Sequence, residues 1–591
     1  MTKRTFTLGV LNSQDMNKII FCIVIWLSSY TPLLCQGKID SAVLKRFDLE
    51  DTVSCFLILG EQLSTINIPE DLNKIQKGEI VYDTLLHIAQ SSQVPIIQYL
   101  EEHSIKYQSF FIVNTILVKI DLTHLQTIVQ SPSISRVLPD FTIAAPQNSK
   151  GVDNRSTAYL NWAIERIRAD SVWARNITGQ NTVIGGQDTG YEWDHYLLKS
   201  KYRGYQSENK VEHAYHWFDA ITEANALHGD TVITDSTNPC GFSAKEPCDD
   251  NGHGTHTMGI MLGSSGNQYS GIAPDAKWVG TRVMDRGYGQ LSTYLSGLQW
   301  FMAPSDTNQH NPDPSLAPHV INNSWACPVI EGCNVRNYWM LDTAISRLNQ
   351  SGVFVVTSAG NEGREGCNSL KNPPAIFKSG FTVGTTNRND SIADFSSKGS
   401  WPFDFVKPEV VAPGVAINSA YLNGTTRSLS GTSMSGPVVA GIVSLMISAN
   451  PDLAGKIKTI RQILLKSTVP ITENACGPQE IPNPVYGYGR IDALLAVQNA
   501  MKIQTPLTDI AKEPALKMYP NPVSSQFHIS LGSVHHLVEI QIMNINGQVM
   551  VTQKKRNIRE FTVNTETLKS GIYFVSIKFD NKSEVKKLIK L

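Results

Sequence analysis

The central part of the chain alternates short apolar runs, rich in β-branched residues, with stretches of helical periodicity. The apolar runs predict strands at residues 182–184, 277–283, 320–322, 353–357 and 381–383. Strands that alternate with helices form a parallel sheet with helices on both faces. We therefore expect an α/β domain over residues 149–502, with its active site at the carboxyl ends of the strands.

A smaller mixed pattern precedes this domain. It predicts a small α+β sandwich over residues 38–148. The strand-like stretches are residues 53–59, 109–120 and 134–138, and the helical stretches are residues 96–103 and 122–131.

From residue 515 onward the pattern changes to short strands alone. Residues 540–544, 561–563 and 572–579 are strand-like, and Asn546-Gly547 forms a turn between the first two. These strands predict a small β-sandwich over residues 515–591, joined to the central domain by a Pro-containing linker over residues 503–514.

The amino end has the pattern of an export signal. Lys18 precedes the apolar run 19–27, and a Ser/Pro stretch follows it to Cys35. The run is well short of the roughly 20 residues that a transmembrane helix needs. Leu34 before Cys35 disfavours a lipoprotein site. We expect a signal peptide over residues 1–37, with Met16 as an alternative first residue.

Composition and charge narrow the possible functions. The formal net charge is -1, with 41% apolar and 17% charged residues, so no basic excess favours nucleic acid. Six of the nine cysteines lie in the central domain, and an even set in an exported chain indicates disulfides. We predict the local pair Cys240–Cys248 and leave the other pairings open. We expect a monomer.

Three short motifs at strand ends carry a chemical pattern. An apolar strand delivers Asp188 into a turn, a Gly-rich loop carries His253 into a helix, and Ser433 begins an apolar helix. Amide hydrolysis needs a nucleophile, a base and an acid that orients the base. Taken alone, the motifs also fit an aspartic protease, a metal site and a helix cap, respectively.

A fourth motif supplies a hydrogen-bond donor. Asn361 follows the strand 353–357 in a tight turn, where its amide can donate to a tetrahedral intermediate. The main-chain N–H of Ser433, at a helix start, also favours the negative charge that develops on this intermediate. We therefore predict an oxyanion hole made by Asn361 and Ser433.

In the order Asp, His, Asn, Ser, these motifs resemble those of the subtilisin-like (subtilase, S8) serine peptidases over roughly residues 160–500. Further similar stretches are residues 271–277, 321–325, 407–413 and 487–493. The resemblance implies a subtilisin-like parallel sheet and an Asp188–His253–Ser433 triad. It makes His253, rather than His256, the base, and it implies that His256 is a buried structural residue.

The chain departs from the family pattern at a few positions. Gln187 stands where an apolar residue is usual, and residues 257–258 and 435–436 also differ. An insertion over residues 199–250 ends in Asp249-Asp250, which fits either a calcium site or, as we prefer, a solvated loop. Catalysis needs no cofactor, structural calcium stays open, and the sequence identifies no set of metal ligands.

Substrate is expected to bind as an added strand beside residues 322–325. The pocket for the substrate residue that precedes the scissile bond would lie between residues 324–326 and residues 358–360. Neither stretch contains an acidic residue, so neither predicts a preference for basic substrate side chains. Trp325 either packs an apolar substrate side chain or fills the core. The predicted substrate-binding residues are Asn322, Asn323, Ser324, Trp325, Ala326, Ser358, Ala359 and Gly360.

Both flanking regions resemble known modules. Residues 110–140 resemble the inhibitor-type propeptides of subtilases, which assist folding and block the cleft until they are removed, and the polar residues 145–150 suit a cleavage site. Residues 519–523, 544–549 and 568–574 resemble the C-terminal sorting domain of the type IX secretion system of Bacteroidetes. A generic adhesion module is the competing interpretation.

The sequence thus predicts a serine endopeptidase that is secreted or held at the outer-membrane surface. Its expected partners are protein or peptide substrates, its own propeptide and the type IX secretion machinery. The alternatives are a catalytically silent surface-binding protein on a subtilase scaffold and an adhesin in which proteolysis is incidental.

Overall fold

The computed structural model describes residues 37–63, 66, 68–69, 72–141, 161–229, 234, 237–266, 268–399, 405–477, 479–503, 516–579 and 582–591. The predicted signal peptide, cleavage stretch and linker lie outside these residues, apart from Gly37 and Ile503. The chain divides into two compact units. The smaller unit contains the chain up to Gln62 together with Ile88–Phe141, and the larger unit contains Leu63–His87 and Thr142–Leu591.

The smaller unit is built on a four-stranded antiparallel sheet. The order is β2-β3-β1-β4. Predicted strands 53–59 and 134–138 are confirmed, but the single strand predicted over 109–120 is a pair, because Asn114 turns the chain with φ +40°. The elements are α2 (Ser41–Arg46), β1 (Thr52–Leu59), β2 (Tyr107–Phe110), β3 (Thr115–Asp121), α4 (Leu122–Ile128) and β4 (Ile134–Pro139).

The long helix α3 (Lys74–Glu102) contributes to both units. The sequence predicts only its last part, residues 96–103, because Pro95 lies inside the helix and normally ends one. The first part of α3, up to His87, groups with the larger unit.

The larger unit contains a nine-stranded sheet in the order β18-β19-β15-β14-β13-β12-β5-β11-β8. Only β18 runs antiparallel to its neighbour. All five predicted strands are present, so the predicted α/β fold is confirmed. The strands are β5 (Val183–Asp188), β8 (Trp217–Asp219), β11 (Lys277–Arg282), β12 (Val320–Asn323), β13 (Phe354–Ser358), β14 (Phe381–Thr386), β15 (Val410–Pro413), β18 (Thr468–Val469) and β19 (Arg490–Ile491).

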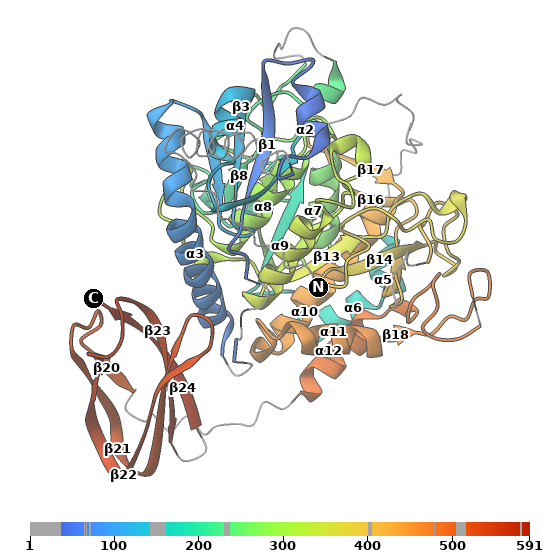
Figure 1. The fold of residues 1–591 in the computed structure, drawn as a ribbon. Helices are drawn as coiled ribbons and strands as arrows, with labels where there is room; N and C mark the ends of the chain where they lie inside the picture. The colour runs from blue at the N-terminus through green and yellow to red at the C-terminus, as the bar shows by residue number, and fades with distance from the viewer. Residues whose placement is uncertain are drawn as a thin grey trace, which may run out of the picture. The chain divides into compact units, whose positions relative to one another are not determined.

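Helices cover both faces of this sheet (Figure 1). Successive side chains of a strand point to opposite faces. On β5, Asp188 meets α7 (His253–Leu262), whereas Gln187 meets α8 (Leu291–Met302). Helix α10 (Thr432–Ala449) packs with α7, and α9 (Tyr338–Gln350) packs with α8. Helix α10 is long and apolar enough to cross a membrane, but it is mostly buried in this core.

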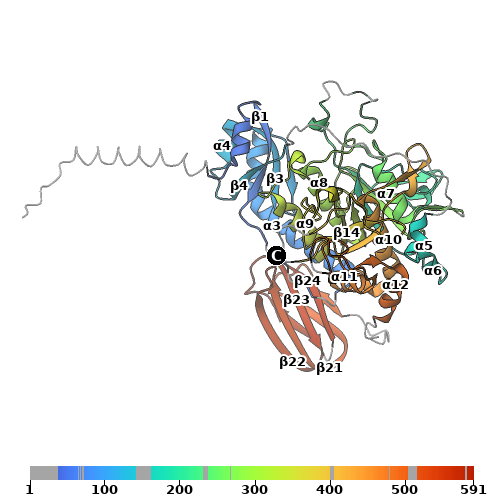
Figure 2. The same cartoon turned by 90° about the vertical axis from the view of Figure 1, so that its right-hand side faces the viewer.

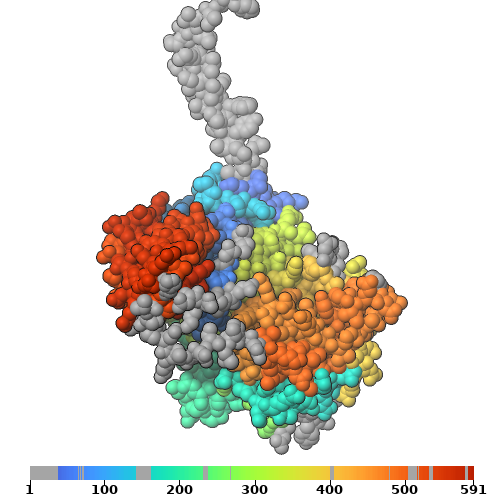
Figure 3. Space-filling model, turned by 90° about the horizontal axis from the view of Figure 1, so that it is seen from below, coloured from blue at the N-terminus to red at the C-terminus, as the bar shows by residue number. Residues whose placement is uncertain are grey.

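The described part of the larger unit contains four more α-helices, and the start of α12 is bonded to the residues between α5 and α6. Arg168 Nε lies 2.7 Å from Asp492 Oδ2, and Ala493 N donates to Ile167 O at 2.8 Å. Figure 3 shows this seam between teal and orange surfaces. The helices are α5 (Trp162–Arg166), α6 (Ala169–Trp173), α11 (Ile457–Lys466) and α12 (Ala493–Lys502), and the remaining short strands are β6 (Tyr205–Ser207), β7 (Lys210–Val211), β9 (Ser264–Ser265), β10 (Gln268–Tyr269), β16 (Ile417–Tyr421) and β17 (Thr425–Leu429).

The carboxyl end is a five-stranded, all-antiparallel sheet that fits the predicted small β-sandwich. Its long strands lie side by side in Figure 2. The predicted turn is confirmed, because Gly547 N donates to Asn544 O at 2.9 Å. The strands are β20 (Lys517–Tyr519), β21 (Gln526–Asn544), β22 (Val549–Asn564), β23 (Gly571–Phe579) and β24 (Lys582–Lys590).

Three disulfides lie in the larger unit. The predicted pair Cys240–Cys248 is confirmed. The sequence left open the other two, Cys327–Cys333 and Cys367–Cys476. The last of these closes a loop of 109 residues.

Candidate active site

Asp188 and His253 meet where the last residue of β5 reaches the first residue of α7. His253 Nδ1 lies 2.7 Å from Asp188 Oδ1. The same oxygen accepts from Thr189 N at 2.8 Å, and Thr257 Oγ1 donates to Asp188 Oδ2 at 3.2 Å. With Nδ1–H bound to the carboxylate, the imidazole keeps its Nε2 lone pair for a proton.

The electrostatics of this pair favour a charged imidazole. Burial alone disfavours the protonated form of His253, but the charge of Asp188 and its hydrogen bond together outweigh burial and leave the pKa of His253 raised above 6.5. Asp249 adds to the increase. The side chain of His253 is 26% exposed, so a substrate can reach the ring.

The approach of α7 to β5 requires glycine at the second helical position. A Cβ atom on Gly254 would lie 2.1 Å from Gly190 O and 3.1 Å from Asp188 Cβ. Any larger residue would push the helix start away from the strand end, so the His-Gly-Thr-His motif is a packing requirement as well as a chemical one.

Asp249 organises the loop that carries His253. Its Oδ1 accepts from Thr189 Oγ1 at 2.8 Å, Gly252 N at 2.8 Å and Asn251 N at 3.0 Å. Its Oδ2 accepts from Thr255 N at 2.9 Å and Thr255 Oγ1 at 2.6 Å. This carboxylate therefore joins the end of β5 to the beginning of α7, a role that the sequence did not reveal.

Asp250, the second acid of the pair considered for calcium, faces a buried arginine. Its Oδ2 bonds Arg282 Nη2, and its Oδ1 accepts from Arg286 N at 2.9 Å. Arg282 also lies 3.0 Å from Asp219 Oδ2. Burial raises the pKa of Asp250 to about 6, although Arg282 opposes the increase. The oxygens of both acids thus bind protein donors.

Ser433 is the second residue of α10 and is tied to Ser324 in both directions. Ser433 Oγ donates to Ser324 O at 3.1 Å, and Ser324 Oγ donates to Ser433 O at 2.9 Å. Within the described part of the chain, no hydrogen bond joins Ser433 to His253. The hydroxyl therefore rests on the chain segment that follows β12.

Asn361 is oriented by the residue before Ser433. Its Oδ1 accepts from Thr432 N at 2.9 Å and from Thr432 Oγ1 at 3.1 Å. These bonds fix the amide so that Nδ2 remains a free donor among the described residues. The N–H of Ser433, in the first turn of α10, has no acceptor within the helix. Asn361 Nδ2 and the N–H of Ser433 thus come from two chain segments that the bonds between Asn361 and Thr432 join.

The predicted substrate edge is wrong for Asn322 and Asn323. Both lie inside β12, which pairs with β13 on one side and β5 on the other through Asn323. A strand with two partners has no free edge, and both side chains are buried. Asn322 instead donates to Ser324 Oγ at 2.8 Å. Main chain that is not paired in the sheet begins at Ser324.

Trp325 is buried against α8. Its ring stacks on Tyr294, with centroids 3.8 Å apart and an interplanar angle of 9°. Tyr294 OH donates to Glu331 Oε2 at 2.7 Å, and burial raises the pKa of Glu331 to about 8. Of the two interpretations left open for Trp325, packing in the core fits this position.

The two predicted pocket walls lie at the carboxyl ends of neighbouring strands, β12 and β13. Ser358 and Ala359 are nearly buried, whereas Ala326 and Gly360 are partly exposed. Gly360 N donates to Thr432 Oγ1 at 3.1 Å, and beyond Ala326 the N–H of Cys327 donates to Pro373 O at 2.8 Å. The Cys327 bond ties the end of the first wall to the loop before β14, and no local sequence pattern indicates it.

His256 is a buried structural residue, as the resemblance implied. Its Nε2 lies 2.9 Å from Arg427 O and 3.1 Å from Ile417 O. Burial lowers its pKa to about 3, so the ring is neutral. Across the described ranges, no three His, Cys, Asp or Glu side chains gather as a metal site.

Comparison with known proteins gives two family matches. A model described as the Subtilase family matches residues 179–489. A model described as a secretion system C-terminal sorting domain matches residues 517–591.

Several curated proteins are similar to parts of the chain. Bacillopeptidase F of Bacillus subtilis is 32% identical and covers 78% of this chain, which spans 32% of that protein. Serine protease AprX of Bacillus subtilis is 30% identical over 42% of this chain and 58% of its own length. Subtilisin DY of Bacillus licheniformis is 30% identical over 50% of this chain and 86% of its own length.

Proposed function

Because the chain belongs to the subtilase family, we propose that it is a serine endopeptidase that hydrolyses protein substrates through Asp188, His253 and Ser433. Its sorting domain indicates secretion, with export to the cell surface or the extracellular space. The observation that carries the proposal is the hydrogen bond between His253 Nδ1 and a buried, immobilised Asp188.

In the proposed reaction, Ser433 Oγ leaves the Ser324 carbonyl by rotation about one bond and passes its proton to His253 Nε2. The oxygen bonds the substrate carbonyl carbon, and the imidazolium formed is stabilised by Asp188. His253 then returns the proton to the leaving amine as the amide C–N bond breaks. Water hydrolyses the resulting acyl-enzyme by the same route in reverse.

The charge that develops on the substrate oxygen needs fixed donors. Asn361 Nδ2 and Ser433 N–H are the proposed pair, because Thr432 holds the amide oxygen of Asn361 and leaves the nitrogen free. Donors that are already oriented cost no reorganisation during the reaction. Side chains and the main-chain N–H of Ser433 would carry this chemistry, and any bound calcium would have a structural role.

We further propose that the chain is made as a precursor. The propeptide-like region would block the cleft until a cut near residues 145–150, made by the enzyme itself, releases the amino end of the peptidase domain. Substrate main chain would pair with the segment that starts at Ser324, since β12 before it has no free edge. The secretion machinery is the proposed partner of the sorting domain.

Covalent labelling tests the proposal. A serine-directed phosphonate should attach to Ser433 in folded, processed protein, and Ser433→Ala should abolish both the label and peptide hydrolysis. Ser435→Ala, which changes a buried serine two residues further along α10, is a matched control that should keep both.

An unlabelled Ser433 in folded protein would favour the catalytically silent scaffold instead. Self-processing is a separate test. A purified Ser433→Ala precursor that matures normally would show that another protease makes the cut.

A further inference from the structure

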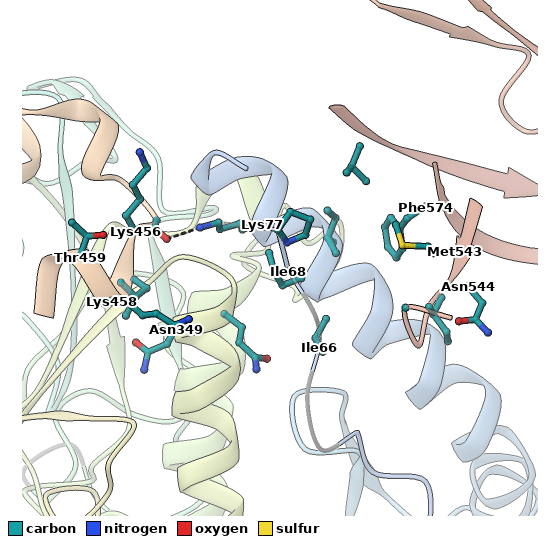
Figure 4. Close-up of a pocket in the computed structure, with 18 residues that line it drawn as sticks. Ile66, Ile68, Lys77, Asn349, Lys456, Lys458, Thr459, Met543, Asn544 and Phe574 are labelled. Atoms are coloured by element: carbon teal, nitrogen blue, oxygen red, sulfur yellow. Dashed lines mark hydrogen bonds between the residues drawn. The ribbon is translucent and has the colours of Figure 1, made fainter. Parts of the chain in front are cut away.

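The chain segment Leu63–His87 precedes the peptidase domain in sequence but groups with the larger unit. Lys74 Nζ donates to Ala317 O at 2.7 Å, and Lys77 Nζ donates to Gly455 O at 3.1 Å. Arg347 Nη2 donates to Leu63 O at 2.8 Å. Figure 4 shows Lys77 reaching toward the loop before α11.

The peptidase side of this contact is shaped to receive a helix. Gly455 adopts φ +79°, and a Cβ atom there would lie 2.9 Å from Lys74 Cα. A Cβ atom on Gly352 would lie 3.2 Å from Lys74 Cγ. The two glycines therefore form a groove in which the first turn of α3 lies directly on main chain.

The two lysines make this contact specific. Lys74 and Lys77 are only 7% and 8% exposed. Burial, with a smaller effect of Arg203, lowers the pKa of Lys74 to about 7. A buried amine is costly unless it is hydrogen-bonded, and here each amine binds a main-chain carbonyl of the peptidase domain.

This groove lies at the opposite end of the sheet from the proposed catalytic residues. Ala317 and Gly352 come just before β12 and β13, whereas Ser324 and Asn361 come just after them. Strand β13 has 5 residues, and a strand rises by about 3.3 Å per residue, so about 16 Å of strand separates the two ends. A segment held in the groove leaves the cleft free.

We propose that Leu63–His87 is an anchor that holds the propeptide-like region on the peptidase domain through this groove, independently of the cleft, so that a cut near residues 145–150 does not release it. The inference rests on the proposed function only for the cut. The anchor itself needs no catalysis.

The test uses the full chain with Ser433→Ala and with a recognition sequence for an added protease in place of residues 145–150. After cutting, the amino-terminal piece should co-elute with the peptidase domain in size exclusion at micromolar concentration. Lys74→Glu with Lys77→Glu should make it elute separately. Lys45→Glu with Lys106→Glu, two exposed lysines of the smaller unit, should not.

A milder variant keeps the test valid if the chain with both lysines changed to glutamate does not fold. Lys74→Met with Lys77→Met keeps the apolar stems and removes both donors, so the Kd of the cut piece should rise by about tenfold or more. Release of the unmodified piece, or retention that neither lysine pair alters, would overturn the anchor. Because the chain carries Ser433→Ala, neither result depends on the proposed catalysis.

Discussion

Replacing Asp249 with asparagine should separate the roles of charge and position around His253. The carboxylate accepts five hydrogen bonds: three through Oδ1 from Thr189, Asn251 and Gly252, and two through Oδ2 from the N–H and hydroxyl of Thr255. Asparagine keeps one acceptor oxygen but puts an amide nitrogen where the other oxygen was. At least the two bonds from Thr255 are then lost.

The size of the effect follows from these bonds. Hydrogen bonds to a charged acceptor contribute about 1.5–3 kcal/mol each, so the loss of two should lower the free energy of unfolding of the peptidase domain by about 3–6 kcal/mol. That is a large fraction of the roughly 5–15 kcal/mol of a typical domain. The start of α7 should shift, and a displacement of about 1 Å at a catalytic group can cost about 10²-fold in kcat.

Two measurements distinguish this role from general stabilisation. Thermal unfolding in the Ser433→Ala background gives the stability loss without self-digestion. In active enzyme, the acid limb of kcat/KM should move to lower pH, because the charge of Asp249 helps to raise the pKa of His253. KM should change little, because the proposed substrate segment that begins at Ser324 does not belong to the elements that Asp249 joins.

Asp275→Asn is the matched control, because it removes the same charge from a carboxylate that is 54% exposed and pairs with Lys201 at 3.1 Å. Exposed pairs contribute about 0–1 kcal/mol, so stability and the acid limb should both stay near wild type. Wild-type stability, or an unmoved acid limb, in Asp249→Asn would refute the reasoning.

Three further outcomes are expected. Because His253 must be neutral to accept a proton and its pKa lies above 6.5, kcat/KM should fall as pH drops through that raised value, as a pH–rate profile will show; a midpoint below 6.5 would contradict it. Asn361→Ala should lower kcat by about 10²–10³, a magnitude that comes from a subtilisin, with unchanged thermal unfolding. Removing the Cys367–Cys476 disulfide, which closes a loop of 109 residues, should lower the free energy of unfolding by about 5 kcal/mol. Removing Cys240–Cys248, which closes a loop of 8 residues, should lower it by only about 2–3 kcal/mol, and denaturant titrations measure both values.

The sequence predicts most of the sheet because its strands are buried on both faces. A strand in that position must be apolar along its length, which is why the strands before Asp188 and Asn361 can be recognised from the sequence alone. The hairpin around Asn114 cannot be recognised in this way, because apolar residues continue on both sides of the turn. Helix α3 is cut short in the prediction by Pro95.

The roles that the sequence missed depend on partners far along the chain. Asp249 is recognisable as an acid near a turn, but its partner Thr189 lies 60 residues away and its main-chain donors have no side-chain signature. Asn322 and Asn323 are predicted at an edge because residues 321–325 resemble a substrate-lining strand of the family. That local resemblance does not reveal that both edges of β12 are already paired.

Gln187 shows how a departure from the family pattern connects the two halves of the site. It lies on the face of β5 opposite Asp188, and its Nε2 donates to Tyr294 O at 2.8 Å. Tyr294 stacks on Trp325 and donates to Glu331. The strand that carries the acid is therefore coupled through α8 to the segment where substrate is proposed to lie. An apolar residue at this position would keep β5 buried but remove this hydrogen bond between the strand and α8.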